Sequence, residues 1–420
     1  MEFRKCFKQV FNFIFNRLLE YFLIVSVILF TPNLPPHTLF SKSISLPPTK
    51  PLTGTLALNS RLNNVEILYK NQLQGPETFA TYNNDLYAGV SGGDIVMLTG
   101  KHIMHVAQTG KPCKAHYEEH ICGRPLGMKF RKHGYLYVAD AYFGILRILV
   151  DDGEKQVIVS PDQIIKGKKT KWFSGVSLAS NGDIYWTASS TEFTLNNGLF
   201  ELLSDPSGRL VHYNAATKIN TVLIDNISAA SGVALSDDEE FVVVSEPITS
   251  RIYRYYLKGP KNGTYDIFLE GLPGYPDNIN SDNHGGFLVP LSYPINSNQI
   301  NVAKYLLRFP WGRKIIARFL SITQWTFETL DKYLPNEISK FVIFTVGRID
   351  PITSLMDSSR TSVLHVSKHG KILDSVHNTN GKIKGITEAF IFKKHLYLGF
   401  AQENYVAKIA LSKLGWDNLA

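Results

Sequence analysis

Pairs of short apolar strands recur along the chain, and this repeat constrains the fold more than any other feature of the sequence. In each pair, two runs rich in Val, Ile, Leu and Tyr are separated by a turn of Gly, Asp or other small residues. Strand-only units that recur at roughly 45–50 residues are typical of the blades of a β-propeller. The sequence therefore predicts an all-β fold, a six-bladed β-propeller over residues 61–420. The expected strand pairs lie at 85–97, 135–148, 183–213, 241–255, 286–366 and 395–409.

The fifth unit is longer than the others because a segment without strand character separates its two strands. Apolar residues recur at helical spacing from Val302 to Leu334, with Pro310 and Pro335 as punctuation. This pattern predicts a helical insertion of two or three helices over 301–340 in the fifth blade. Its basic and aromatic side chains leave two interpretations open. The helices either lie in a membrane interface or cover the propeller mouth with their apolar face inward.

Near the amino end, basic residues precede an apolar run at 21–30. Both a cleaved signal peptide and an uncleaved anchor begin in this way, and the poor cleavage pattern after the run favours the anchor. Because the cations come first, the positive-inside rule predicts a type II single-pass protein. Residues 1–31 would form the cytosolic tail and signal anchor, and the Pro-, Ser- and Thr-rich residues 32–60 a stalk. The propeller would be lumenal or extracellular, at the plasma membrane or the endoplasmic reticulum.

Cysteine usage is consistent with an oxidising compartment. Cys113 and Cys122 are close enough in sequence to close one loop by a local disulfide. The alternative is a metal pair with His116 or His120, but no second ligand pair with zinc spacing is visible.

Two glycosylation sequons and the distribution of basic residues indicate modifications and partners. Asn226 and Asn262 begin sequons that can accept N-linked glycans if the propeller is lumenal. The net charge of +8 could indicate nucleic acid, but the basic residues are spread along the chain. The densest run, 166–171, is expected to be a solvated loop. We therefore expect no nucleic-acid partner. The expected partners are a membrane, through the amino-terminal anchor, and a small ester or other ligand at the propeller mouth.

Five sequence blocks, in this order, resemble the strictosidine synthase-like proteins, and their animal branch in particular. The resemblance runs from about residue 60 to the end of the chain. It implies a six-bladed propeller, the same number of blades as the repeat predicts. The blocks are GPE at 75–77, CGRPLG at 122–127, VADAY at 138–142, PGYPDN at 273–278 and LYLG at 396–399.

The resemblance also implies an axial metal site. Related lactonase propellers hold calcium in the axial channel with Glu, Asn and Asp side chains, and calcium takes about six to eight oxygen ligands. The matching positions here are Glu77, Asp277, Asn278, Ser174 and Ser231. Ser174 and Ser231 stand where asparagine is usual, and a serine hydroxyl is a weaker and shorter-reaching ligand. Any calcium is therefore expected to bind weakly.

Glu388 matches the catalytic glutamate of the plant synthase, so the resemblance implies an acid–base role if burial raises its pKa. The stretch 124–127 lacks the histidine that lactonase-type members have there. Two functions remain open. One is a membrane-anchored hydrolase of arylesterase or lactonase type, acting on small uncharged esters at the axial mouth. The other is a non-catalytic propeller that binds ligands or proteins at the cell surface or in the endoplasmic reticulum.

Overall fold

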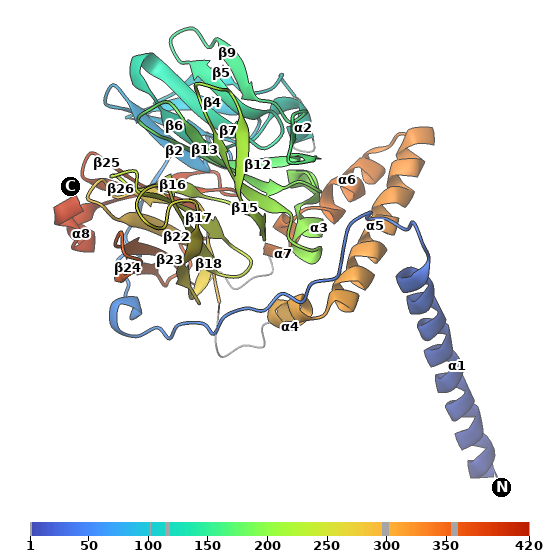
Figure 1. The fold of residues 1–420 in the computed structure, drawn as a ribbon. Coiled ribbons are helices and arrows are strands. Elements are labelled where there is room, and N and C mark those ends of the chain that lie inside the picture. Colours follow the sequence, from blue (N-terminus) through green and yellow to red (C-terminus); the bar gives the residue numbers. More distant parts are fainter. Residues whose placement is uncertain (1, 101, 114–117, 296–301, 354–359, 420) are drawn as a thin grey trace. The chain divides into compact units, whose positions relative to one another are not determined.

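The computed structural model describes the whole chain except residues 1, 101, 114–117, 296–301, 354–359 and 420 (Figure 1). The chain divides into two compact units. One is largely helical and comprises Met1–Ile44, Leu203–Asp205 and Val302–Gly347. The other, here called the β unit, comprises Ser45–Leu202, Pro206–Asn301 and Arg348–Ala420.

Antiparallel sheets, mostly of four strands, make up the β unit (Figure 1). The first two are β2 (Thr78–Tyr82), β3 (Asp85–Gly89), β4 (Asp94–Thr99) and β5 (His102–Gln108), then β6 (Pro125–Phe130), β7 (Tyr135–Asp140), β8 (Gly144–Leu149) and β9 (Lys155–Val159). The next two are β12 (Trp172–Leu178), β13 (Ile184–Ser190), β14 (Gly208–Tyr213) and β15 (Asn220–Ile227), then β16 (Val233–Leu235), β17 (Phe241–Glu246), β18 (Arg251–Tyr256) and β19 (Tyr265–Glu270).

Two further sheets complete the set. One contains β20 (Gly274–Pro276), β21 (Asn280–Ser281), β22 (Phe287–Pro294), β23 (Thr361–Val366) and β24 (Ile372–Asn378). The other contains β25 (Ile386–Phe392), β26 (His395–Phe400), β27 (Val406–Ala410) and β1 (Glu66–Leu68), and a separate hairpin joins β10 (Ile164–Ile165) to β11 (Lys168–Lys169). Short helical elements are η1 (Gly54–Leu56), α2 (Glu119–Cys122), η3 (Lys132–Gly134), η4 (Leu195–Asn197), α3 (Gly198–Leu203), α7 (Asp350–Thr353), α8 (Leu411–Leu414) and η5 (Asp417–Leu419).

The strand pairs predicted from the sequence are the second and third strands of these sheets. Second strands such as Phe241–Glu246 are buried along their whole length, so they read as continuous apolar runs. The turn between β2 and β3 shows why the pairs form locally. Asn83 and Asn84 have φ values of 48° and 67° there, as a tight two-residue hairpin turn requires.

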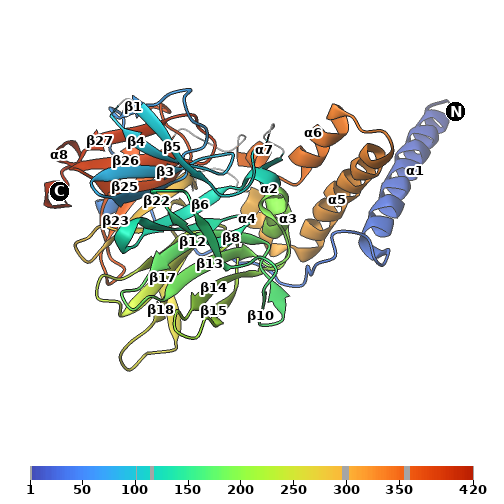
Figure 2. The same cartoon turned by 90° about the horizontal axis from the view of Figure 1, so that it is seen from above.

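Successive sheets contact one another in a closed ring, through their first strands except at β22. β2 contacts β6, β6 contacts β12, β12 contacts β16 and β16 contacts β21, while β22 contacts β25 and β25 contacts β2. Figure 2 shows β6 next to β12. Glycines permit this close approach. A Cβ atom at Gly127 would lie 2.8 Å from the Ser174 carbonyl oxygen, and one at Gly175 would lie 2.8 Å from the Ser231 carbonyl oxygen. The core therefore lies between neighbouring sheets, which pack face to face around one axis.

The ring is also joined by hydrogen bonds between the two ends of the β unit. β1 pairs with β27, with Glu66 opposite Lys408 and Leu68 opposite Val406. A strand that precedes the first sheet in sequence thus completes the last sheet. The sequence repeat does not reveal this pairing because β1 has only three residues and its partner lies at the far end of the chain.

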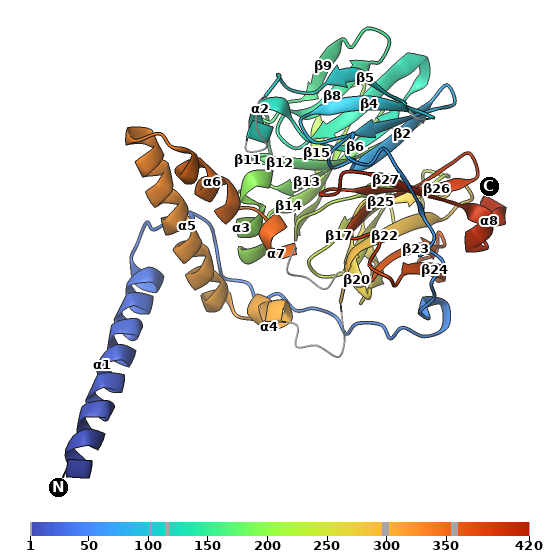
Figure 3. The same ribbon diagram turned by 180° about the vertical axis from the view of Figure 1, so that it is seen from behind.

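The helical unit contains α1 (Glu2–Phe30), α4 (Val302–Arg308), α5 (Pro310–Tyr333) and α6 (Glu337–Val346), of which α4 to α6 come between β22 and β23 in the chain (Figure 3). Buried Arg313 joins its segments by donating hydrogen bonds to the carbonyl oxygens of Leu203 and Ser204, both at 2.7 Å. Asp205 accepts hydrogen bonds from the backbone nitrogens of Ser41 and Lys42 at 2.8 and 2.9 Å. Part of the expected stalk is therefore bound within this unit.

Residues 12–30 of α1 are long and apolar enough to cross a membrane by length and composition. Cys113 and Cys122 form the predicted disulfide, with their Cα atoms 5.4 Å apart. Both thiols are thereby used, so the alternative metal pair does not form. Of the two histidines considered for that pair, His116 lies outside the described residues, and His120 lies on α2.

Candidate functional site

Glu77 and Arg124 form a buried ion pair where two neighbouring first strands begin. Glu77 directly precedes β2 and Arg124 directly precedes β6. The Arg124 Nη2 atom lies 2.7 Å from Glu77 Oε2, and the Arg124 Nε atom lies 3.2 Å from the same oxygen. Arg124 also donates to the Ala401 carbonyl oxygen at 2.8 Å and to the Ser91 hydroxyl. Burial raises the pKa of Glu77, and the charge of Arg124 opposes that rise.

Asp277 and Ser231 form a second polar contact close to Glu77. The Ser231 hydroxyl donates a hydrogen bond of 2.8 Å to Asp277 Oδ1. Burial raises the pKa of Asp277 to about 7, the Glu77 carboxylate adds to the rise, and the Ser231 hydrogen bond opposes it. Asp277 therefore changes its protonation state near neutral pH.

Asn278 links the segment before β21 to two other sheets. Its backbone nitrogen donates to the Thr387 carbonyl oxygen at 3.1 Å, and its side-chain nitrogen donates to the Glu77 carbonyl oxygen at 3.4 Å. The Thr387 hydroxyl is buried and has no hydrogen-bond partner among the described residues. An unpaired buried hydroxyl is uncommon, because buried polar groups are normally hydrogen-bonded.

Glu388, Asn280 and Lys129 form a chain of hydrogen bonds next to this group, in which Glu388 and Asn280 are buried and Lys129 is partly exposed. Glu388 is only 2% exposed, on β25, and accepts a hydrogen bond from the Asn280 side chain. Lys129 Nζ donates to Asn280 Oδ1 at 2.6 Å. Burial raises the pKa of Glu388, and Lys129 opposes that rise. Burial also lowers the pKa of Lys129. Both groups are thus moved toward the pH range in which they can exchange protons with a substrate.

Most of the residues that sequence analysis selected lie in this one group. Glu77, Asp277, Asn278 and Ser231 are joined by the contacts above, and Asn278 also bonds to Glu388. Ser174 is buried on β12, and its carbonyl oxygen lies against Gly127 of the neighbouring first strand.

Two functional residues are not predicted from the sequence, namely Lys129 as a candidate and Arg124 as the partner of Glu77. Arg124 lies inside a block that carried the family resemblance, but its pairing with Glu77 is a tertiary contact between two sheets. Lys129 had one usable signal. It is a cation inside a short, otherwise mostly apolar strand, Pro125–Phe130.

The arrangement does not fit a tightly bound calcium ion. Calcium needs several oxygen ligands, usually including carboxylates. Here the Arg124 guanidinium already supplies positive charge to Glu77, and the Ser231 hydroxyl donates its hydrogen to Asp277. Over the described part of the chain, His, Cys, Asp and Glu side chains form no group of three or more that could hold a metal ion.

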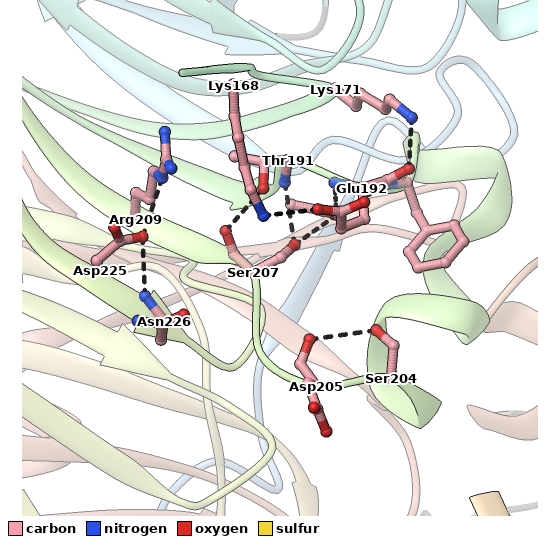
Figure 4. Close-up of polar contacts among 12 residues, drawn as sticks. Lys168, Lys171, Thr191, Glu192, Ser204, Asp205, Ser207, Arg209, Asp225 and Asn226 are labelled. Atoms are coloured by element: carbon pink, nitrogen blue, oxygen red, sulfur yellow. Dashed lines mark hydrogen bonds and ion pairs between the residues drawn. The ribbon is translucent and has the colours of Figure 1, made fainter. Parts of the chain in front are cut away.

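Lysines of the basic run at 166–171 form ion pairs with nearby acidic groups, and Figure 4 shows Lys168 beside Glu192. Lys168 lies 2.7 Å from Glu192 and Lys166 lies 3.2 Å from Asp225, while Lys169 pairs with Asp162 at 2.9 Å.

The two sequons differ in exposure. Asn226 is exposed beside Asp225, and Ser228 of its sequon is buried. All three residues of 262–264 are exposed, in the turn between β18 and β19.

Comparisons with known proteins give both a family and a fold. The strictosidine synthase family model matches residues 174–260, and the model of the amino-terminal part of strictosidine synthase-like proteins matches 54–98. The chain is 36% identical over 403 residues to the adipocyte plasma membrane-associated protein hemomucin of Drosophila melanogaster, covering 94% of this chain and 69% of that protein. It is 32% identical over 377 residues to the adipocyte plasma membrane-associated protein of Salmo salar, covering 89% and 83%. The human protein of that name is 30% identical over 364 residues, covering 86% and 81%.

Among solved structures, a gluconolactonase from Xanthomonas campestris aligns with a TM-score of 0.51 at 12% identity, covering 90% of this chain and 99% of that one. A luciferin-regenerating enzyme aligns with a TM-score of 0.51 at 13% identity, covering 83% and 95%. At such low identity these similarities show the fold alone, which is a propeller.

Proposed function

The chain belongs to the strictosidine synthase-like family, in the branch of the adipocyte plasma membrane-associated proteins and hemomucin, and we propose that it is a membrane-anchored hydrolase with an acid–base site on the propeller axis. The substrate would be a small uncharged ester or lactone that enters at the axial mouth. The lactone class comes from the name of the gluconolactonase that shares the fold. The observation that carries the proposal is the chain of hydrogen bonds from buried Glu388 through Asn280 to partly exposed Lys129.

The proposed chemistry needs only these residues and water. The Glu388 carboxylate accepts a proton from water as the water oxygen bonds to the ester carbonyl carbon. The bond from that carbon to the leaving oxygen then breaks, and Glu388 returns the proton to the leaving oxygen. The Lys129 ammonium, held by Asn280, stabilises the negative charge that develops on the substrate. The unpaired Thr387 hydroxyl offers a further hydrogen bond to a bound ligand.

Around this site, we propose a six-bladed propeller attached to a membrane by α1. The sheets would form six blades, with the helices at 301–340 inserted in the fifth. Helix α1 would cross the membrane once as a type II signal anchor, with the propeller outside the cell or in the lumen. The apolar length of α1 and the membrane-associated relatives support a membrane crossing, and the basic residues that precede the apolar run support the type II direction. Asn226 and Asn262 would then be accessible for glycosylation.

We propose only weak binding of calcium at the residues selected from the sequence. A cation held by Glu77, Asp277, Asn278, Ser174 and Ser231 would have to displace Arg124 from Glu77. No step of the proposed reaction depends on it.

A second candidate function is a non-catalytic propeller that binds ligands or proteins. The observation that favours it is the internal satisfaction of the axial groups, because Arg124 neutralises Glu77 and Asn280 bonds Glu388. Such a group can hold the first strands together without chemistry.

The test compares the full chain with two glutamate variants, using phenyl acetate and a δ-lactone as substrates. Glu388→Gln should lower kcat/KM by about 10²–10⁴-fold. Glu201→Gln is the matched control, because Glu201 is equally buried but is bonded by Ser190 and Ser207 away from the axial residues. That control should keep its activity. If the folded wild-type chain turns over neither substrate, with or without calcium, the binding function is the better description.

A further inference from the structure

Large apolar side chains on α5 and α6 are exposed. The set used here, called the aromatic face, is between 58% and 72% exposed. Exposed apolar groups this numerous mark a membrane or protein interaction site rather than an ordinary soluble surface. Its members are Trp311, Phe319, Trp325 and Tyr333, all on α5.

On α5 these residues share one side of the helix. At 100° per residue, Trp311, Phe319, Trp325 and Tyr333 fall within roughly one third of the circumference. Buried Arg313 and Ala317 lie on the opposite side, where Arg313 bonds Leu203 and Ser204. Arg318, which is also buried, lies within the same third of the circumference as the aromatic side chains. The aromatic face therefore points away from the Arg313 contacts, on the side of α5 that carries Arg318.

The same helix binds the end of the apolar helix α1. Arg318 donates to the carbonyl oxygens of Ile28, Leu29 and Thr31 at 2.7, 3.0 and 3.1 Å. Carbonyls in the last turn of a helix have no partner within the helix, so Arg318 acts as its cap. Trp311 adds a ring contact with Phe30, with centroids 6.1 Å apart.

These contacts place α5 where α1 would leave a membrane. Tryptophan and tyrosine are enriched at that level of a bilayer, because their rings are apolar and their polar atoms face water. Lys314 lies over the Trp311 ring, 5.4 Å from its centroid, so a cation accompanies the aromatic side chains. Apolar side chains with flanking cations are typical of helices that lie in the headgroup layer.

We propose that the aromatic face lies in the headgroup layer of the bilayer that α1 crosses, as a second membrane contact of the helical unit. This inference rests on the proposed anchoring by α1. The continuity between Arg318, Trp311 and the end of α1 selects the bilayer over a protein partner. Two contacts would restrict the helical unit to one orientation on the membrane, which α1 alone would not do.

Tryptophan quenching in vesicles tests the inference with the full chain. Trp311 and Trp325 are 58% and 60% exposed, whereas Trp172, Trp186 and Trp416 are buried in the β unit. In vesicles of phosphatidylcholine brominated near the headgroup end of the acyl chain, part of the emission should be quenched. The double variant Trp311→Phe/Trp325→Phe should lose that quenched part. Both substitutions keep an aromatic ring, and circular dichroism checks that the variant is folded.

Flotation of the vesicles tests anchoring by α1 separately from the membrane contact of the aromatic face. If the chain does not float with vesicles, anchoring by α1 fails, and this inference fails with it. If the chain floats but its tryptophans are not quenched, the anchor stands and the inference is overturned. If the protein floats and is not quenched, crosslinking of two chains through the variant Trp325→Cys would assign the face to a second copy instead.

Discussion

The guanidinium of Arg124 lies 2.7 Å from the carboxylate of Glu77, at the point where the first strands of two neighbouring sheets begin. The resemblance to related lactonase propellers implies a calcium ion bound by a glutamate at this position. In this chain a side-chain cation from the adjacent sheet supplies the positive charge. The pairing also ties the two sheets together, because each partner precedes a different first strand.

Replacing Arg124 should therefore create a need for another cation. Arg124→Met leaves Glu77 buried without its partner, and we expect a loss of about 3–5 kcal/mol in the free energy of unfolding at pH 7. Millimolar calcium should restore part of this loss in the variant and leave wild-type Tm unchanged. Thermal unfolding with calcium, magnesium and chelator measures both effects.

The double variant Arg124→Met/Glu77→Gln is the control. It removes the unpaired charge, so it should recover stability and lose the response to calcium. A wild-type Tm that rises with calcium as much as that of the single variant would contradict the proposed role of Arg124.

Asp277 should make stability depend on pH. Burial raises its pKa to about 7 in the folded protein, whereas an unfolded Asp titrates near about pH 4. The folded state thus binds the extra proton between these values. The contribution of this proton to the free energy of unfolding is fully present below about pH 4 and is lost as the pH rises through about 7. Asp277→Asn should be more stable than wild type at pH 8, by about 4 kcal/mol, and lose this advantage at pH 4.

Urea unfolding at several pH values measures this difference. Asp162→Asn is the control, because Asp162 is 86% exposed, and it should leave the pH dependence between 4 and 8 unchanged. A stability of Asp277→Asn that follows the wild-type curve at every pH would show that the Asp277 carboxyl is not protonated in the folded state.

Much of the fold could be predicted from the sequence because the second and third strands of each sheet are local hairpins. Their apolar runs and turns read directly, as at Asn83 and Asn84. First strands could not be found in this way. β16 has three residues, and β12 has shifts in register around Phe173 and Val176. Such strands are defined by contacts with neighbouring sheets rather than by a sequence period.

The candidate site likewise contains residues that could be predicted from the sequence and residues that could not. Glu77, Asp277 and Glu388 could be selected because they match residues of related proteins. Their partners could not be selected, since Arg124 and Lys129 reach them from another sheet. Whether a buried carboxylate faces a cation, a metal or water depends on such tertiary contacts, and these decide its chemistry.

The disulfide between Cys113 and Cys122 should be present in the protein from its membrane. Alkylation without reduction should label one cysteine, Cys6, and alkylation after reduction should label all three. The variant Cys113→Ser/Cys122→Ser should lose about 2–3 kcal/mol of stability, because the unfolded chain regains the freedom of the closed loop. Mass spectrometry identifies the labelled residues, and labelling of all three without reduction would rule out the bond.

Glycosylation should report the proposed topology. Asn262 lies in a fully exposed turn, so Asn262→Gln should remove one glycan, seen as a shift in electrophoretic mobility that glycosidase treatment reproduces. Asn226→Gln should remove a second. An unglycosylated propeller that protease digests completely in sealed microsomes would place it in the cytosol and contradict the type II orientation.

Lys129 should set the pH at which the proposed hydrolase works. Its charge opposes the rise in the pKa of Glu388, and the nearby Asp277 carboxyl adds to that rise. Lys129→Met removes the opposing charge, so the pKa of Glu388 should rise further. A general base must be deprotonated, so the acidic limb of the kcat/KM profile for phenyl acetate should move to higher pH. Lys168→Met is the control, because Lys168 is 49% exposed and pairs with Glu192, away from Glu388 and Lys129. The pH profile of this control should match that of wild type. A Lys129→Met enzyme with wild-type activity and an unshifted profile would remove Glu388 and Lys129 from the chemistry and leave them as supports of the β unit.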